Sequence, residues 1–238
     1  MLLQILTYTH HLTTMLFGIF LSAFFLGVKQ NKKNVCILLG GGAVSGLFFL
    51  ICNTVFGSLF TEAVYPIFVH LPLFLLLVFY YRFRWLPSII SIMTAYLCCQ
   101  FSNWAGIFAL SLSGLDWVYY LVRIIVTVAV FAFLSRYLCQ TTALLFAKSD
   151  RELYILGAMP FVYYVFDYST TKFSMLLYSG NKVVVEFLAF AMCISYVIFL
   201  FVYFQIKMIP SDQTSIPDKE HLYLSLIHIS EPTRLRCI

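Results

Sequence analysis

The stretch VCILLGGGAVSGLFFLICNTVF, residues 35–56, contains no charged side chain. About 20 mainly apolar residues in a helix are enough to cross the hydrocarbon layer of a bilayer. We therefore predict a transmembrane helix here. The segment directly before it, KQNKKN at 29–34, carries three lysines. Lysine and arginine beside a membrane helix mark the end that stays in the cytoplasm.

The rest of the chain repeats this pattern. The protein is 62% hydrophobic and 11% charged, with a mean hydropathy of +0.92, whereas a soluble domain has about 45–50% apolar and about 25% charged residues. Continuous apolar runs favour helices over a β-barrel, whose strands alternate in polarity. We predict an all-α, polytopic membrane protein with seven spans, at residues 4–27, 35–56, 64–81, 88–111, 117–135, 153–171 and 183–204. The first run is too long for the apolar part of a signal peptide and is taken as a retained span.

Basic residues are unevenly distributed between these spans. The first, third and fifth gaps hold Lys29, Lys32, Lys33, Arg82, Arg84, Arg136, Lys148 and Arg151. The second and fourth gaps hold none, and the sixth holds Lys172 and Lys182. Because basic loops stay in the cytoplasm, we predict an N-terminus outside the cell and a cytoplasmic C-terminus.

Charged side chains inside a span cost about 2.5–3.5 kcal/mol to insert and therefore suggest a function. Three occur within the predicted spans: Arg123, Asp167 and Glu186. Weaker polar candidates are His10, His11, His70 and Asn103. On the predicted topology all of these residues fall in the outer half of the membrane. This placement predicts an outward-facing polar cup in which an external ligand is sensed. The alternative is that side chains near a boundary extend to the interface, or are simply packed there.

Gly42 and Gly46 lie one helical turn apart within the second predicted span. Small residues at this spacing let two helix backbones approach closely. The pattern fits either packing within the chain or a contact in a dimer.

Motifs of most other functional classes are missing. The sequence has no Cys-x-x-Cys or His-x-x-x-His spacing and no glycine-rich phosphate loop, so no metal, cofactor or catalytic site is predicted. The net charge of +5 is accounted for by the basic loops, and no nucleic-acid-binding motif occurs. The lipid bilayer is the expected partner.

The C-terminal part differs in character from the spans. Residues 205–223 are polar, contain Pro210 and Pro217, and are predicted to form a cytoplasmic linker. The stretch LSLIHISEPTR, at 224–234, resembles the translation of a transposase adapter used in DNA library preparation. We therefore expect 224–238 to be a non-native tail, and the gene to encode a further cytoplasmic domain that this chain lacks.

Three segments carry a resemblance to a known family: YTHHLTTMLFGIFLSAFFLG at 8–27, RELYILGAMPFVYYVFDYSTT at 151–171 and SGNKVVVEFLAFAMCISYVIFLFVYF at 179–204. Residues 1–204 resemble the membrane sensor region of clostridial GHKL-type histidine kinases, which are similar in outline to the peptide-sensing kinases of accessory gene regulator systems. The resemblance implies a multi-pass protein of the bacterial cytoplasmic membrane and a homodimer. It also implies an external signal such as a peptide, and a response regulator reached through the missing domain. The chain itself is not expected to be an enzyme.

Two functions remain open from the sequence. The first is a seven-helix sensor domain, residues 1–204, that serves as the input module of a two-component histidine kinase. The second is a small transporter or permease component, which predicts an inverted repeat and broken helices at the membrane midplane. No internal repeat is evident.

Overall fold

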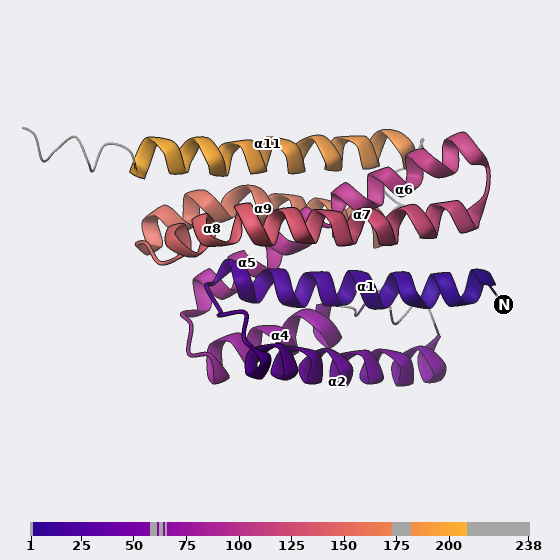
Figure 1. Ribbon diagram of the computed structural model, residues 1–238, viewed down its shortest axis with the longest axis horizontal. Helices are drawn as coiled ribbons and strands as arrows, with labels where there is room; N and C mark the ends of the chain where they lie inside the picture. Colours follow the sequence, from indigo (N-terminus) through magenta and orange to yellow (C-terminus); the bar gives the residue numbers. More distant parts are fainter. Residues whose placement is uncertain (1, 58–60, 62–63, 65, 173–181, 209–238) are drawn as a thin grey trace, which may run out of the picture. The chain divides into compact units, whose positions relative to one another are not determined.

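The computed structural model describes residues 2–57, 61, 64, 66–172 and 182–208 (Figure 1). Within these residues the secondary structure is helical and no strand occurs. The chain divides into two compact units, Met1–Tyr196 and Val197–Ile238. The packing described below lies within the first unit. The predicted linker and adapter-derived tail lie almost wholly outside the described residues.

The described elements follow one another along the chain. They are α1 (Leu2–Phe25), α2 (Lys32–Phe56), η1 (Pro66–His70), α4 (Leu71–Leu75), η2 (Leu76–Tyr80), α5 (Trp85–Cys98), α6 (Gln100–Ser113), α7 (Asp116–Tyr137), α8 (Cys139–Phe146), α9 (Asp150–Lys172) and α11 (Lys182–Met208) (Figure 1).

Four of the described helical segments are long and apolar enough to cross a membrane: Lys32–Phe56, Trp85–Ser113, Asp116–Tyr137 and Phe187–Ile206. The segment Pro66–Tyr80 is apolar but shorter. Helices α1 and α9 lie at the predicted spans 4–27 and 153–171, but their polar side chains keep them outside this group. The protein is thus an all-helical chain with several helices suited to a membrane.

The exposed surface agrees with a lipid environment. On α2 the side chains of Leu47, Phe48 and Phe56 are 58–63% exposed, and Phe79 at the end of η2 is 74% exposed. Contiguous apolar surface of this kind is rare on soluble monomers and marks contact with a membrane or a partner.

The predicted spans 64–81 and 88–111 are more irregular than the sequence suggested. Residues 66–80 form a short α-helix between two π-helical turns. Pro72 lies in the first turn of this α-helix, and a proline within a longer helix removes one backbone hydrogen bond and widens the turn before it. The span predicted at 88–111 consists of two helices, α5 and α6, which meet at Cys99.

The fifth gap, predicted as a loop, contains the short helix α8. Cys139, Thr142, Leu145 and Phe146 are its buried residues. Their spacing is that of one face of a helix, and burial of this face explains why the connection between α7 and α9 forms a helix.

Helix α1 packs against α2, α5, α7 and α8. Along α7, the rings of Phe17 and Phe24 both lie 6.2 Å from that of Phe131. Along α2, a Cβ added to Gly42 would lie 3.1 Å from Ile19 Cδ1, and one added to Gly46 would lie 3.4 Å from the Met15 methyl carbon. Both glycines thus face α1 of the same chain.

Helix α9 packs on α5, and Gly157 lies at this contact. A Cβ at this position would lie 2.7 Å from Ile90 Cδ1. Beside this contact, the buried Tyr196 of α11 donates a hydrogen bond from its hydroxyl to the carbonyl of Leu156, at 2.9 Å. The Tyr196 hydroxyl also lies 3.4 Å from Thr94 Oγ1 of α5. One α11 side chain therefore contacts both α5 and α9.

Candidate functional site

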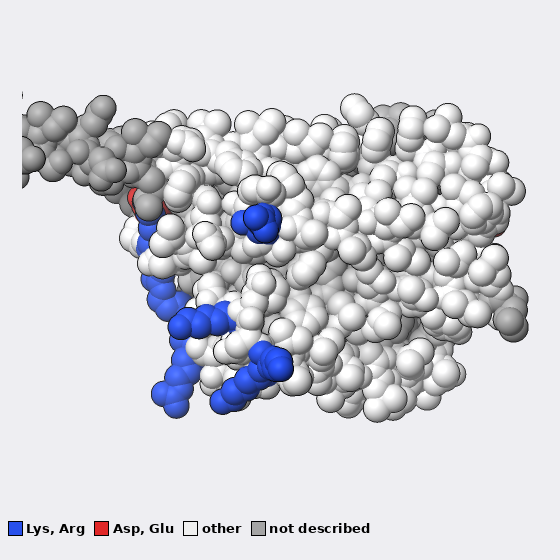
Figure 2. Space-filling model, viewed as in Figure 1, with Lys and Arg blue, Asp and Glu red and all other residues white. Residues whose placement is uncertain are grey.

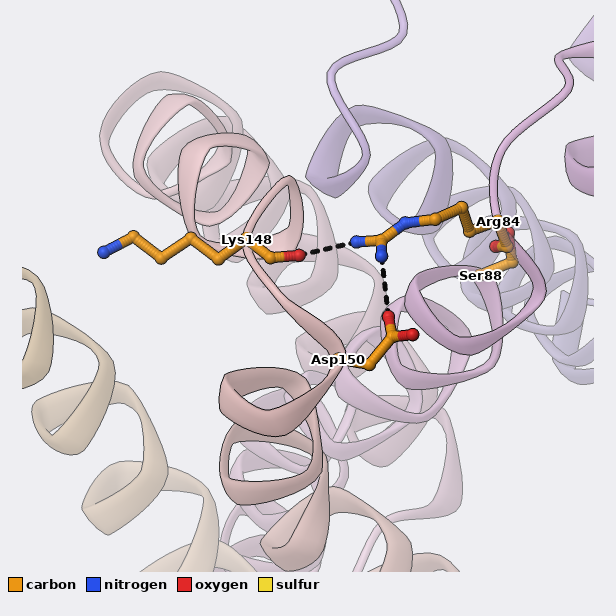
Figure 3. Close-up of polar contacts among 4 residues, drawn as sticks. All are labelled: Arg84, Ser88, Lys148 and Asp150. Atoms are coloured by element: carbon orange, nitrogen blue, oxygen red, sulfur yellow. Dashed lines mark hydrogen bonds and ion pairs between the residues drawn. The ribbon is translucent and has the colours of Figure 1, made fainter.

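Basic side chains gather toward one end of the face drawn in Figure 2. We call this region the basic end and define it by Lys29, Lys32, Lys33, Arg82, Arg84, Arg136 and Lys148. Contacts between the loops bring its parts together. Arg84, before α5, forms a salt bridge to Asp150 Oδ1 and donates to the Lys148 carbonyl, both at 2.6 Å (Figure 3). Lys29 and Arg136 line one pocket, so the three gaps rich in basic residues meet at the same end.

Arg123 lies on α7, away from the basic end. At ~1.5 Å rise per residue it is about 20 Å along the helix from Arg136. Its Nη1 donates a hydrogen bond to the Tyr119 hydroxyl, and its guanidinium carbon lies 5.2 Å from the centre of the Tyr119 ring. Its Nε is buried and has no hydrogen-bond partner within the part of the chain that the structure describes. Among the described residues no carboxylate forms a salt bridge with Arg123.

Gly106 of α6 makes room for this arginine. A Cβ on Gly106 would lie 2.4 Å from Arg123 Cγ, 2.8 Å from Arg123 Cδ and 3.1 Å from Tyr119 Cδ2. Contacts below 3.0 Å are not tolerated, so only glycine lets α6 and α7 approach this closely with the arginine between them. The arginine is therefore built into the packing of the two helices.

His10 of α1 is buried, with 4% of its surface exposed, and it lies within Coulombic range of Arg123. Its ring lies 5.8 Å from the Tyr120 ring and 5.2 Å from the His11 ring. Thr14 Oγ1 lies 3.3 Å from His10 Nδ1. His11 itself is exposed. Of the two histidines, His10 is the one that belongs to the interior.

A second polar group joins η1, α5 and α9. Tyr96 donates from its hydroxyl to Asp167 Oδ2, and the Tyr164 hydroxyl lies 3.0 Å from His70 Nδ1. The Tyr96 ring lies 5.1 Å from that of Tyr164 and 5.7 Å from that of His70. We call these four residues the tyrosine cluster. It brings together His70 and Asp167, which the sequence proposed separately.

The arginine and the tyrosine cluster share one electrostatic neighbour. Cys99, at the junction of α5 and α6, lies within Coulombic range of both Arg123 and Asp167. At ~1.5 Å per residue, Asp167 lies about 25 Å along α9 from Asp150 at the basic end. The ionisable groups thus form one polar layer, defined by His10, Arg123 and the tyrosine cluster, in the half of the bundle remote from the basic end.

Three of the predicted site residues, His11, Asn103 and Glu186, are not assigned to this layer. Asn103 donates from its side-chain amide to Gln100 Oε1, at 3.2 Å, within α6. Glu186 falls in α11, but its side chain lies outside the described residues. Sequence reasoning missed Tyr96, Tyr164, Tyr119 and Gly106. Tyr119 precedes Arg123 by four residues and Tyr164 precedes Asp167 by three, and these spacings place each pair on one helix face.

The polar layer is suited to binding and to charge recognition. The structure places no group of three or more His, Cys, Asp or Glu side chains suitable for a metal ion within the residues it describes. No family model, curated protein or solved structure matches the chain.

Proposed function

We propose that the chain is the membrane-embedded input module of a two-component sensor histidine kinase. In this proposal the basic end faces the cytoplasm and the polar layer lies in the outer half of the membrane, where it senses an external signal. The kinase part rests on the sequence resemblance. The sensing part rests on the geometry of the polar layer.

The observation that carries the proposal is Arg123. A cation within a membrane bundle is expensive, and its partner is normally a carboxylate or a backbone carbonyl. Here, among the described residues, the guanidinium donates its hydrogen bond to Tyr119, and Nε has no partner. Such an arginine has unused capacity to bind an anionic or carbonyl group of a ligand, because it has donors in a fixed planar arrangement.

The packing offers a route from this layer to the C-terminal helix. The Tyr96–Asp167 hydrogen bond joins α5 to α9, and Tyr196 of α11 contacts both of these helices through Thr94 and Leu156. A ligand that separates α5 from α9 would move the groups that hold Tyr196. A small shift of one helix against its neighbours is a common way to pass a signal through a bundle.

Recovery of the uninterrupted gene tests the kinase part. A coding region that continues from the linker into an ATP-binding module, beside a response-regulator gene, supports the proposal. A stop codon soon after Phe204 would remove it.

A signalling assay on the intact protein tests the sensing part. In membrane vesicles, Arg123→Gln should abolish the signal-dependent change in autophosphorylation while basal activity remains. Arg82→Gln is the matched control, because it removes the same charge at the basic end. A wild-type response in Arg123→Gln at normal membrane levels would overturn the sensing role.

A further inference from the structure

A pocket of about 680 Å³ opens at the basic end, between the last turns of α1 and α7 and the start of α8. Its lining includes the basic residues Lys29 and Arg136 and the polar residues Gln30 and Gln140. Phe24 and Val28 form an apolar wall. A pocket of this size accommodates a small polar group with part of an apolar chain.

The backbone fixes the shape of this pocket. Gly27 has φ of +86°, and α1 ends in paired hydrogen bonds, from Val28 N to the Ala23 carbonyl at 3.1 Å and from Gly27 N to the Phe24 carbonyl at 2.9 Å. These bonds are those of a Schellman motif, in which glycine is preferred because its φ is positive. A Cβ on Gly27 would lie 3.4 Å from the Ala143 Cβ of α8. The turn that carries Lys29 is therefore held against α8.

Within the described part of the chain, no salt bridge compensates the charge of the pocket. Arg84, at the same end, is paired with Asp150. Among the described residues neither Lys29 nor Arg136 has such a partner. Two cations that share a pocket repel each other, and an anion between them removes this repulsion.

We propose that this pocket binds the phosphate group of an anionic phospholipid. Lys29 and Arg136 pair with the phosphodiester, Gln30 and Gln140 supply further hydrogen bonds, and Phe24 and Val28 contact the start of the acyl chains. Basic pockets between helices at the cytoplasmic interface are suited to anionic head groups. The inference requires that the bundle crosses a membrane, but it does not require the signalling role.

Native mass spectrometry of the full chain, released from nanodiscs of phosphatidylcholine with a minority of phosphatidylglycerol, tests the proposal. We expect wild type to retain phosphatidylglycerol in preference to phosphatidylcholine. Each basic residue contributes roughly a fivefold factor to such binding, so the Lys29→Gln, Arg136→Gln double variant should lose retention by about 25-fold.

The matched control is Lys32→Gln with Lys33→Gln. It removes the same charge from the same end of the bundle, but neither lysine lines the pocket. Retention close to wild type in this control supports the pocket. Equal loss in both double variants, or no preference for phosphatidylglycerol in wild type, would overturn the proposal. Binding of inorganic phosphate without any retention of phosphatidylglycerol would also overturn it, because the ligand would then be free phosphate. Circular dichroism and gel filtration confirm that both variants fold.

Discussion

Replacement of Gly106 with alanine tests whether Arg123 is built into the helix packing as described. The new methyl group would lie 2.4 and 2.8 Å from the Cγ and Cδ atoms of Arg123. These atoms are close to the backbone of α7, so the arginine cannot avoid the methyl group by moving only its guanidinium group. Either α6 and α7 separate, or the side chain changes rotamer and loses Tyr119.

The expected cost follows from two opposing effects. Overpacking of a closely packed site costs about 1–3 kcal/mol. Alanine within a helix is favoured over glycine by about 0.5–1 kcal/mol. We therefore expect Gly106→Ala to lower the free energy of unfolding by about 1–2 kcal/mol.

Unfolding by sodium dodecyl sulfate in mixed micelles, followed by circular dichroism, measures this quantity. Gly40→Ala in α2 is the matched control, since a Cβ there meets nothing within 4 Å. It should be neutral or slightly stabilising. In an Arg123→Ala background the cost of Gly106→Ala should largely disappear, which gives a coupling free energy of about 1 kcal/mol or more. If Gly106→Ala behaves like Gly40→Ala, the close contact between α6 and Arg123 does not exist.

Three further predictions concern the other contacts. Tyr96→Phe removes the hydrogen bond to Asp167 and should lower the free energy of unfolding by about 1–2 kcal/mol in the same assay, because the acceptor is a carboxylate. If the loss is no larger than that of the exposed control Tyr80→Phe, the hydrogen bond does not exist. Gly157→Ala should cost about 1–3 kcal/mol through its contact with Ile90, and Ile90→Ala in the same chain should relieve most of that cost; additive losses would contradict this. Arg84→Gln breaks a salt bridge whose side chains are 49% and 60% exposed. The loss of unfolding free energy should therefore stay below about 1 kcal/mol and should be smaller in about 1 M NaCl. A loss that does not depend on salt would rule out an electrostatic origin.

The sequence predicted well those features that depend on composition alone. The spans 35–56 and 117–135 correspond to α2 and α7, because long apolar runs leave a helix as the way to satisfy the backbone in lipid. The break at Cys99 and the π-helical turns near Pro72 escaped prediction. The sequence at both places stays apolar, and hydropathy does not distinguish a bent helix from a straight one.

The candidate site was predicted in part. Arg123, Asp167, His10 and His70 attract notice because a charge or an imidazole is conspicuous in an apolar run. Their tyrosine partners do not, because a tyrosine in such a run is equally suited to the membrane interface. Gly106 was also missed, since its role depends on a side chain of another helix. The sequence therefore identifies the charged and imidazole side chains, whereas the helix packing is needed to identify the residues that contact them.

The brevity of the segment Pro66–Tyr80 has a mechanical consequence. As an α-helix this segment would be about 22 Å long, and the hydrocarbon core of a bilayer is about 30 Å thick. If this segment crosses the bilayer, hydrophobic mismatch predicts a preference for lipids with short acyl chains around the exposed Phe79 and Ile67. Bilayer thickness would then affect the position of His70, which lies on this segment, and with it the contact between His70 and Tyr164.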